Sequence, residues 1–559
     1  MAQKILIYQI FTRLYRNRNA TRKEAGTLEE NGAGKFNDIN DTELKGIKDM
    51  GITHVWFTGV IRHATTTDYS EYGIPKNHPA VIKGRAGSPY AITDYYDVDP
   101  DLAVDVRNRM SEWEKLVERT HQAGLKVIMD FVPNHVAREY KSICAPDGVE
   151  GLGEGDDTSK GFFPEKNNFY YCTGCDFNPG IDLWSGEQHP YYEYPAKATG
   201  NDVFNAWPGQ NDWYETVKLN YGVDYYAGGA KHFSPIPDTW NKMLGILEFW
   251  ASKGIDGFRC DMAEMVPPEF WDWALAKLKD KYPDILIVGE VYNPWLYRRF
   301  IEAGFDYLYD KVGMYDKLRD VTCGHAPAYS ITSAWQATDD IQDHMLYFLE
   351  NHDEQRIASD FFAGEGRKAL PALAVSLLLN KNPFMLYFAQ QYGERGMDKE
   401  GFSGIDGRTT IFDYWSIDTM LRAANDDLTD KELDLLRHYL LFMKVATSEK
   451  CITDGQMYDL MYANPHSEQF NPDIHYSFIR KYEDELIIVV ANFGDDGSNI
   501  SVKIPAHAFD YLNIKPGIWK GVGFVTGVIR EVNLQPDCEV RFGRPGRGVA
   551  ILKLSYSAS

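Results

Sequence analysis

The chain has 559 residues, of which 44% are apolar and 25% charged, the proportions of an ordinary soluble globular protein. A formal net charge of −23 argues against a phosphate-rich partner such as nucleic acid, and a neutral substrate suits this surface better. No apolar run approaches the ~20 residues that a membrane-spanning helix requires, so we expect no membrane partner.

Short apolar runs alternate with helical patterns from the N-terminus to about residue 390. Strands are predicted at residues 4–9, 52–58, 125–130, 254–260, 285–289, 305–309, 344–349 and 383–388. Helices are predicted at 41–50, with Asp41 as the N-cap, and at 102–123, 235–252, 268–281 and 367–379. Strands that are apolar throughout are buried on both faces of a parallel sheet. Eight of them, alternating with helices, predict an α/β fold, a (β/α)8 TIM barrel.

Two stretches depart from this alternation. Residues 136–233 are rich in Gly, Asn, Asp and aromatic residues without a long helical period, which is too long for a loop in a compact barrel. Beyond residue 454, alternating or β-branched runs at 476–481, 486–492, 499–504 and 549–554 indicate an antiparallel β-sandwich. We therefore expect a barrel from residues 1–135 and 234–453, a domain inserted after strand three at 136–233, and a C-terminal β-sandwich domain at 454–559.

The N-terminus and the cysteines bear on the cellular compartment. Residues 1–8 enter a strand-like run at once and lack the apolar region and cleavage site of a secretory signal, which predicts a cytoplasmic protein. A chain from which a signal had been removed would look the same. The seven Cys form no dense framework, which fits reduced thiols. Cys172 and Cys175 form one CxxC, with Cys144 upstream, but no second pair completes a zinc site, so a metal role is disfavoured.

An Arg and an Asp lie two positions apart at the end of the fourth predicted strand, Arg259 and Asp261. Residues i and i+2 of a strand point to the same face, so both side chains would project into one cavity. There the guanidinium can hold the carboxylate ionised, and an ionised carboxylate can attack as a nucleophile. Alone, the pattern is equally typical of a structural ion pair.

Other carboxylates decide between these interpretations. The C-terminal ends of barrel strands form the rim where active sites lie, and strands three, four, five and seven run into Asp130, Asp261, Glu290 and Asp353. Arg259, His135 and His352 lie at the same level. Carboxylates that converge in a cleft without a metal-binding His cluster suggest cleavage of a glycosidic bond. That reaction needs one acid to protonate the leaving oxygen and one carboxylate to attack or to activate water.

The four rim segments resemble, in order and position, the four signature regions of glycoside hydrolase family 13, the α-amylase family. They are residues 130–135 (DFVPNH), 257–261 (GFRCD), 289–292 (GEVY) and 348–353 (FLENHD). The family also inserts a domain after strand three and appends a β-sandwich, so the resemblance covers the whole chain. It implies a retaining double displacement.

The resemblance also implies a role for each rim residue. Asp261 would be the nucleophile and Glu290 the acid/base, while Asp353 would bind sugar hydroxyls and stabilise the transition state. Five other side chains would support them: Arg259 orienting Asp261, His135 and His352 binding sugar hydroxyls, Tyr90 stacking on the sugar at the cleavage subsite, and Asp130 as a structural partner of Arg259.

Three departures from the family pattern bear on the substrate. Tyr90 is followed by Ala91, whereas exo-acting α-glucosidases usually carry an Asp there that helps to close the pocket; this favours an open, endo-type cleft. Glu264 and Met265 replace the Lys-His pair that serves the leaving-group side in α-amylases, so binding on that side must differ. Residues 217–220 (VKLN) are closer to neopullulanase-like members than to typical amylases.

Calcium is a candidate cofactor that the resemblance raises. Asn134 matches a family calcium ligand, and the carbonyl that normally completes the site belongs to Met265 here. Further oxygen donors of the insert are Asp156, Asp157, Asp202 and Asp212. The alternative is that Asn134 simply hydrogen-bonds its loop. No organic cofactor is expected.

We therefore expect an α-amylase-type hydrolase that cleaves α-1,4-linked glucans or maltooligosaccharides with retention. The alternatives within the family are an α-glucosidase, a debranching or neopullulanase-like enzyme, or a transglycosylase, all of which share the three carboxylates. A non-catalytic carbohydrate-binding scaffold is disfavoured, because such proteins typically lose one of these carboxylates and all three stand here. The sequence indicates no oligomeric state.

Overall fold

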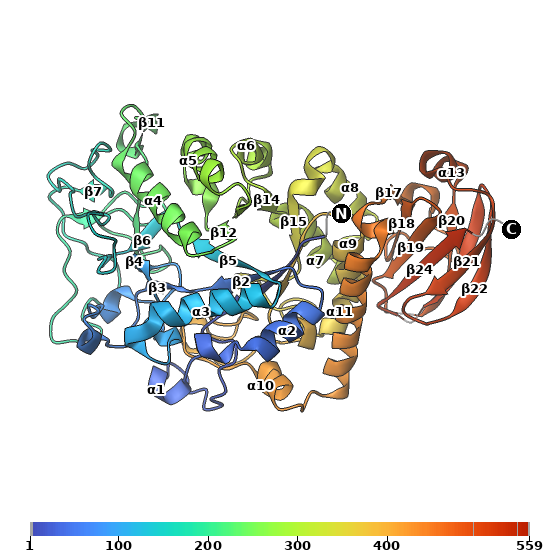
Figure 1. Ribbon diagram of the computed structural model, residues 1–559, viewed down its shortest axis with the longest axis horizontal. Helices are drawn as coiled ribbons and strands as arrows, with labels where there is room; N and C mark the ends of the chain where they lie inside the picture. Colours follow the sequence, from blue (N-terminus) through green and yellow to red (C-terminus); the bar gives the residue numbers. More distant parts are fainter. Residues whose placement is uncertain (1–3, 496, 545, 557–559) are drawn as a thin grey trace.

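Eight parallel strands form a closed barrel at the centre of the protein (Figure 1). The computed structural model describes residues 4–495, 497–544 and 546–556. Within these residues the barrel order is β1-β16-β15-β14-β13-β12-β5-β2. The strands are β1 (Leu6–Phe11), β2 (His54–Thr58), β5 (Lys126–Phe131), β12 (Gly257–Cys260), β13 (Leu286–Gly289), β14 (Tyr307–Tyr309), β15 (Met345–Phe348) and β16 (Phe384–Tyr387). Each overlaps its predicted run, so the prediction of a TIM barrel is confirmed.

Helices surround the barrel. Every residue of β1, β12, β15 and β16 is buried, and most are apolar, as in strands that are covered on both faces. The helices around the barrel are α2 (Asp41–Asp49), α3 (Arg109–Gln122), α4 (Asp238–Ser252), α5 (Pro268–Lys281), α6 (Tyr297–Glu302), α7 (Asp316–Thr322), α8 (Ser330–Gln336), α9 (Leu370–Leu378) and α11 (Asp430–Ser448). The connecting segments contain α1 (Leu28–Asn31), α10 (Asp418–Ala424) and α12 (Lys450–Thr453). In the described parts of the chain, no helix combines the length and apolarity needed to cross a membrane.

Several helices begin at a different residue from the one predicted; α4 begins at Asp238 instead of 235, and α9 at Leu370 instead of 367. Asn40, not Asp41, is the N-cap of α2, because its side chain accepts hydrogen bonds from two backbone N–H groups of the first turn. The helix predicted at 102–123 begins only at Arg109. The Glu112 carboxylate binds two backbone N–H groups of the preceding segment, which is thereby held in tight turns.

The chain between β5 and α4 forms a lobe beside the barrel, at the left of Figure 1, that we call the insert. Its described strands are short. β6 (His135–Ala137) pairs with β9 (Thr216–Lys218), β7 (Tyr171–Cys172) with β8 (Ala196–Lys197), and β10 (Val223–Asp224) with β11 (Ala230–Lys231). A further pair, β3 (Ile61–His63) and β4 (Ile92–Val98), lies in the segment after β2. Buried Arg138 stabilises the insert, because its guanidinium lies 3.7 Å from the centre of the Phe177 ring and 2.7 Å from Glu193 Oε1.

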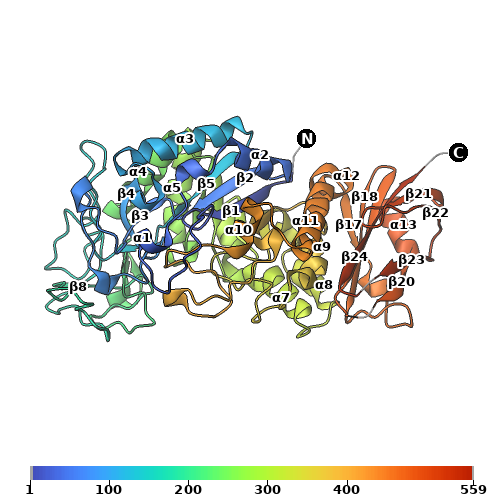
Figure 2. The same ribbon diagram turned by 90° about the horizontal axis from the view of Figure 1, so that it is seen from below.

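The C-terminal residues form two antiparallel sheets on the side of the barrel opposite the insert (Figures 1 and 2). The described order of the larger sheet is β17-β18-β19-β24-β21-β22, and β20 pairs with β23 in the other. The strands are β17 (Gln456–Asp459), β18 (His475–Tyr482), β19 (Glu485–Asn492), β20 (Ser498–Ile504), β21 (Gly517–Gly523), β22 (Ile529–Leu534), β23 (Cys538–Arg544) and β24 (Gly548–Tyr556). Helix α13 (Ala506–Leu512) follows β20. The predicted antiparallel architecture is confirmed.

A buried arginine joins the larger C-terminal sheet to the barrel. Arg480 on β18 donates hydrogen bonds to four backbone carbonyls near the ends of α9 and α12, those of Leu379, Cys451, Ile452 and Gly455. Carbonyls at a helix end lack partners within the helix, and a positive charge there also suits the helix dipole. Burial lowers the pKa of Arg480 to about 10, so the guanidinium stays charged at neutral pH. Every residue of α9 is buried at this junction.

Arg480→Met should destabilise the protein, because it keeps the apolar stem and leaves four buried carbonyls without a donor. Each unsatisfied buried acceptor costs about 1–3 kcal/mol before relaxation. We expect a total loss of about 3 kcal/mol, which for a chain of this length lowers Tm by about 3 °C in calorimetry. The control is Arg298→Met, whose partner Asp340 is exposed; such pairs contribute at most about 1 kcal/mol. Equal melting temperatures in the two variants would contradict the role of Arg480.

Candidate active site

The carboxylates that the sequence predicted to converge meet at the C-terminal ends of the barrel strands. Asp130 lies in β5, Asp261 follows β12, Glu290 follows β13, and Asp353 lies in the loop after β15. The parallel register of the barrel places Arg259 on β12 directly beside Asp130 on β5. All of these side chains therefore reach the same end of the barrel.

Arg259 is the centre of the cluster, and it is only 1% exposed. Its Nη1 lies 2.7 Å from Asp261 Oδ1, and its Nη2 lies 2.9 Å from Glu290 Oε2. Asp130 Oδ1 is more distant, at 3.7 Å from Nη1. Nε donates a hydrogen bond to the Tyr309 hydroxyl at 3.2 Å. Two acidic side chains are thus held on neighbouring nitrogens of one guanidinium, which fixes their relative positions.

Burial and mutual repulsion raise the pKa values of carboxyl groups in the cluster. The pKa of Asp261 lies well above its ordinary range, because the group is buried and faces Glu290, and Arg259 offsets only part of this. The same two causes raise the pKa of Asp353 to about 7. Burial raises the pKa of Asp130 to about 6. The free site therefore shares protons among its carboxyl groups near neutral pH.

Neutral hydrogen-bonding groups form the walls beside the cluster. The rings of Tyr90 and His352 stack with centroids 5.2 Å apart, and the Tyr90 hydroxyl lies 2.6 Å from His352 Nε2. The other ring nitrogen of His352 is 2.9 Å from Gln9 Nε2 on β1. Burial lowers the pKa of both His352 and His135, that of His135 to about 3, so both imidazoles are neutral. A neutral imidazole can donate one hydrogen bond and accept another, which suits a hydroxyl group.

Asp130 accepts hydrogen bonds that help to hold the Tyr90 side of the site in place. Its Oδ2 accepts hydrogen bonds from Trp56 Nε1 at 3.1 Å and from the Gly59 backbone at 3.4 Å, and its Oδ1 accepts one from the Tyr90 hydroxyl at 3.4 Å. Asp130 is absent from the residues that line the cavity described next. These contacts agree with the supporting role that the resemblance implied.

A cavity of about 320 Å³ opens over the cluster. Five of the predicted residues line it together: Tyr90, His135, Asp261, Glu290 and Asp353. The other lining residues are Lys83, Ser88, Trp213, Glu215, Thr216, Met262, Tyr292, Ile411 and Phe412. The structure therefore brings the predicted carboxylates and ring side chains around one space.

Several contacts of the site were missed by the sequence analysis. Tyr309 and Gln9 contact Arg259 and His352, and both lie in barrel strands, at the C-terminal end of β14 and near that of β1. Position at a strand end was a signal that could have found them. Lys83 Nζ lies 2.9 Å from Glu215 Oε1 and joins the segment before Tyr90 to the insert across the cavity wall. A contact between two loops that are far apart in the sequence leaves no such signal.

Asn134, the predicted candidate calcium ligand, contacts an ammonium group instead. Lys218 Nζ donates a hydrogen bond to Asn134 Oδ1, lies 2.7 Å from Asp202 Oδ1, and lies 3.4 Å from the carbonyl oxygen of Met265. Three predicted calcium donors therefore surround one buried positive charge. The residues present do not fit calcium at this position, because the ion would meet the ammonium group at close range.

The remaining predicted calcium donors do not join this group. Asp156, Asp157 and Asp212 bind backbone N–H groups within the insert. Among the described residues, Asp94, Asp97 and Cys144 do lie close enough to share a metal ion. Arg109 already binds both oxygens of Asp97, at 2.7 and 2.8 Å, so that cluster is an internal ion-pair network.

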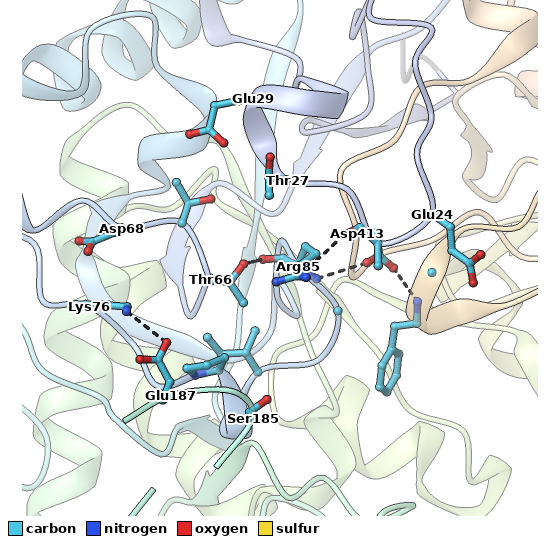
Figure 3. A pocket seen from close by; sticks show the side chains of 17 residues that line it. Glu24, Thr27, Glu29, Thr66, Asp68, Lys76, Arg85, Ser185, Glu187 and Asp413 are labelled. Atoms are coloured by element: carbon cyan, nitrogen blue, oxygen red, sulfur yellow. Dashed lines mark hydrogen bonds and ion pairs between the residues drawn. The ribbon is translucent and has the colours of Figure 1, made fainter. Parts of the chain in front are cut away.

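A second cavity has a volume of about 720 Å³ (Figure 3). The consecutive residues Lys83 and Gly84 line the first and the second cavity, respectively. Polar groups of the second cavity pair with one another, as Lys76 does with Glu187 at 3.2 Å (Figure 3). It contains none of the predicted site residues, so it is not the candidate active site.

Comparisons with known proteins identify the family of the chain. The family model "Alpha amylase, catalytic domain" matches residues 9–432. Alpha-amylase 3 of Dictyoglomus thermophilum is 22% identical over 87% of this chain and 84% of its own length. Alpha-amylase MalA of Haloarcula japonica is 26% identical over 71% of this chain, which spans only 45% of that protein. Neopullulanase 2 of Thermoactinomyces vulgaris is 21% identical over 90% of this chain and 72% of its own length.

Solved structures agree on the fold. The crystal structure of the α-amylase from Geobacillus thermoleovorans, complexed with acarbose, matches with a TM-score of 0.64 and 18% identity, over 100% of this chain and 99% of that chain. The family model covers most of the chain, and the predicted signature segments lie together at one end of the barrel. The chain therefore belongs to the α-amylase family, glycoside hydrolase family 13. Its relatives in this family are glycosidases and related glucan-acting enzymes.

Proposed function

We propose that the protein hydrolyses α-1,4-glucosidic bonds in glucans or maltooligosaccharides with retention of configuration. The observation that carries this proposal is the Arg259 bridge, which holds Asp261 and Glu290 on neighbouring nitrogens beside the cavity. A retaining glycosidase needs two carboxyl groups fixed close together, one to attack and one to transfer a proton. The α-amylase and neopullulanase names of the relatives support an α-glucan substrate.

In the first chemical step, Asp261 forms a bond to the anomeric carbon. Arg259 binds Oδ1, which leaves Oδ2 as the attacking oxygen. The proton of Glu290 moves to the glycosidic oxygen as its bond to the anomeric carbon breaks, so the leaving sugar departs as a neutral alcohol. The product of this step is a glycosyl ester on Asp261.

In the second step, water takes the place of the leaving sugar. Glu290, now ionised, accepts a proton from water as the water oxygen attacks the anomeric carbon and the ester bond to Asp261 breaks. Asp353 would bind hydroxyls of the same sugar and stabilise positive charge at its ring. Tyr90 would stack on the sugar, while His135 and His352 hydrogen-bond its hydroxyls.

The favoured mode is endo-type cleavage, because the small side chain of Ala91 follows Tyr90. An exo-acting α-glucosidase is the second candidate. Lys83 and Glu215 both line the cavity and pair with each other, which closes the wall between the insert and the segment before Tyr90. A closed wall of this kind favours short substrates or chain ends.

Products from maltoheptaose distinguish these functions. We expect internal fragments whose newly formed reducing ends are α-configured, as followed by chromatography and NMR. Glucose alone would favour the α-glucosidase, and products longer than the substrate would favour transglycosylation. Asp261→Asn should lower kcat by roughly four orders of magnitude or more without lowering Tm, because it removes the nucleophile. The control is Asp272→Asn, at an exposed ion pair on α5. Full activity of Asp261→Asn would sink the proposed mechanism.

The raised pKa of Asp261 predicts the position of the acid limb of the pH profile. A nucleophile must be ionised, so kcat/KM falls as the pH drops through the pKa of Asp261. We expect this limb above the ordinary Asp value of about 3.9. Glu290→Gln removes the neighbouring negative charge, so the limb should move to lower pH. The measurement uses an aryl maltoside whose leaving group needs no proton; a limb that stays in place or rises contradicts the assignment.

We also infer that the Lys218 ammonium takes the place of a calcium ion between the insert and the barrel. Lys218 lies on β9 of the insert, Asn134 follows β5, and Met265 lies in the turn after β12. One buried positive charge therefore ties three segments together, as a bound cation would. Asp202 supplies the compensating negative charge.

Lys218→Met should destabilise the protein by about 3 kcal/mol, because it removes the ammonium and leaves Asp202 and the Asn134 oxygen unpaired. Lys281→Met, at an exposed ion pair, is the matched control. In the wild type, neither a chelator nor added calcium should shift Tm, whereas added calcium could bind and stabilise only the Lys218→Met variant. A wild-type Tm that rises with calcium, together with an unchanged Tm in Lys218→Met, would contradict this inference.

A further inference from the structure

A glutamate three residues after Asp261 binds protein backbone near Glu290. Glu264 lies in the short turn Ala263–Met265 that follows β12. Its Oε2 accepts hydrogen bonds from the backbone N–H groups of Tyr292 at 3.0 Å and Asn293 at 2.9 Å. Glu264 is absent from the residues that line the catalytic cavity. Its carboxylate therefore fastens the segment after Glu290 to the turn after Asp261.

Tyr292 connects the Glu264 hydrogen bonds to the carboxyl group of Glu290. Its hydroxyl donates a hydrogen bond to Glu290 Oε1 at 2.6 Å. Glu290 Oε2 accepts a hydrogen bond from the Met262 backbone at 2.7 Å and lies 2.9 Å from Arg259 Nη2. Because Oε2 already accepts the Met262 N–H and lies beside the Arg259 charge, a transferable proton belongs on Oε1, the oxygen beside the Tyr292 hydroxyl.

The turn that carries Glu264 is itself fixed. Trp271 Nε1 donates to the carbonyl of Ala263 at 3.2 Å, and Lys218 Nζ lies 3.4 Å from the carbonyl of Met265. Met262, the first residue after Asp261, has a φ of 43°, in the left-handed region that a non-glycine residue adopts only when its surroundings impose it. The turn can therefore act as a rigid anchor for the segment at 292–293.

We propose that Glu264 is a positioning residue for the acid/base Glu290, acting through the backbone of residues 292–293 and the Tyr292 hydroxyl. This inference rests on the proposed function of Glu290. A lysine at position 264 could not make these contacts, because an ammonium group has no acceptor.

The Tyr292 hydroxyl suits both chemical steps. It accepts a hydrogen bond when Glu290 carries a proton on Oε1, and it donates one when Glu290 is ionised. Without Glu264, two backbone N–H groups lose their acceptor and the segment that carries Tyr292 is released. Proton transfer requires the donor and acceptor atoms to lie within about 2.6–3.2 Å, so a displaced Oε1 protonates the glycosidic oxygen less efficiently.

The test compares kcat/KM on two substrates, because this parameter reports the step that forms the glycosyl ester. The sugar leaving group of maltoheptaose needs a proton, whereas the phenol of a nitrophenyl-type aryl α-maltotrioside departs without one. Glu264→Ala should lose about 10- to 100-fold on maltoheptaose and less than about 3-fold on the aryl substrate. Tyr292→Phe should show the same selective loss, and Glu264→Gln should restore most of the activity because its amide oxygen accepts both N–H groups.

Glu248→Ala, at an exposed ion pair on α4, is the matched control, and thermal melting shows whether each variant is folded. Equal losses on the two substrates, or unchanged kinetics in Glu264→Ala, would overturn the positioning role. Failure of the proposed function looks different, since the wild type itself would then leave both substrates uncleaved.

Discussion

The site depends on one buried guanidinium. Asp130 lies in β5, and Asp261 and Glu290 directly follow the adjacent strands β12 and β13. At low dielectric their carboxylates would repel one another strongly. Arg259 binds Asp261 and Glu290 directly and faces Asp130, so a single positive charge makes their assembly possible. Breaking such a buried pair leaves an uncompensated charge, so Arg259 is as much a condition of the folded barrel rim as of its chemistry. Because Arg259 lies within β12, strand register and not loop conformation sets the spacing of the two acidic groups.

Excess acid over base determines how the site can act. One guanidinium cannot neutralise the surrounding carboxyl groups, so protons remain on part of the cluster near neutral pH. The same side of the barrel holds a second buried cation, Lys218, whose partners include the turn that leads away from Asp261. The turn after Asp261 is thus held by Arg259 on one side and by the insert on the other.

The barrel and the carboxylate cluster were predictable because both depend on local sequence. Continuous apolar runs marked all eight strands, and Asp261 and Glu290 stand at the ends of two of them. What the sequence did not reveal are contacts between distant segments. Lys218 lies far along the chain from Asn134, so only the folded chain shows that an ammonium group occupies the position expected for calcium. The inward-facing carboxylate of Glu264 was likewise invisible, since its partners are backbone N–H groups and leave no trace in the residue types.

Helix α9 joins the barrel and the C-terminal sheets into one core, although the two follow one another as separate segments of the sequence. It packs against α11 and β15 of the barrel and against β19 and β24 of the C-terminal sheet, and it has no exposed residue. The two layers therefore share one core across the junction. A chain shortened at the end of the barrel would present an apolar helix to water, with the carbonyls that Arg480 binds left bare. The catalytic barrel and the C-terminal sheets should accordingly unfold as one cooperative unit. The sheets are part of the enzyme's core and cannot be removed without exposing that core.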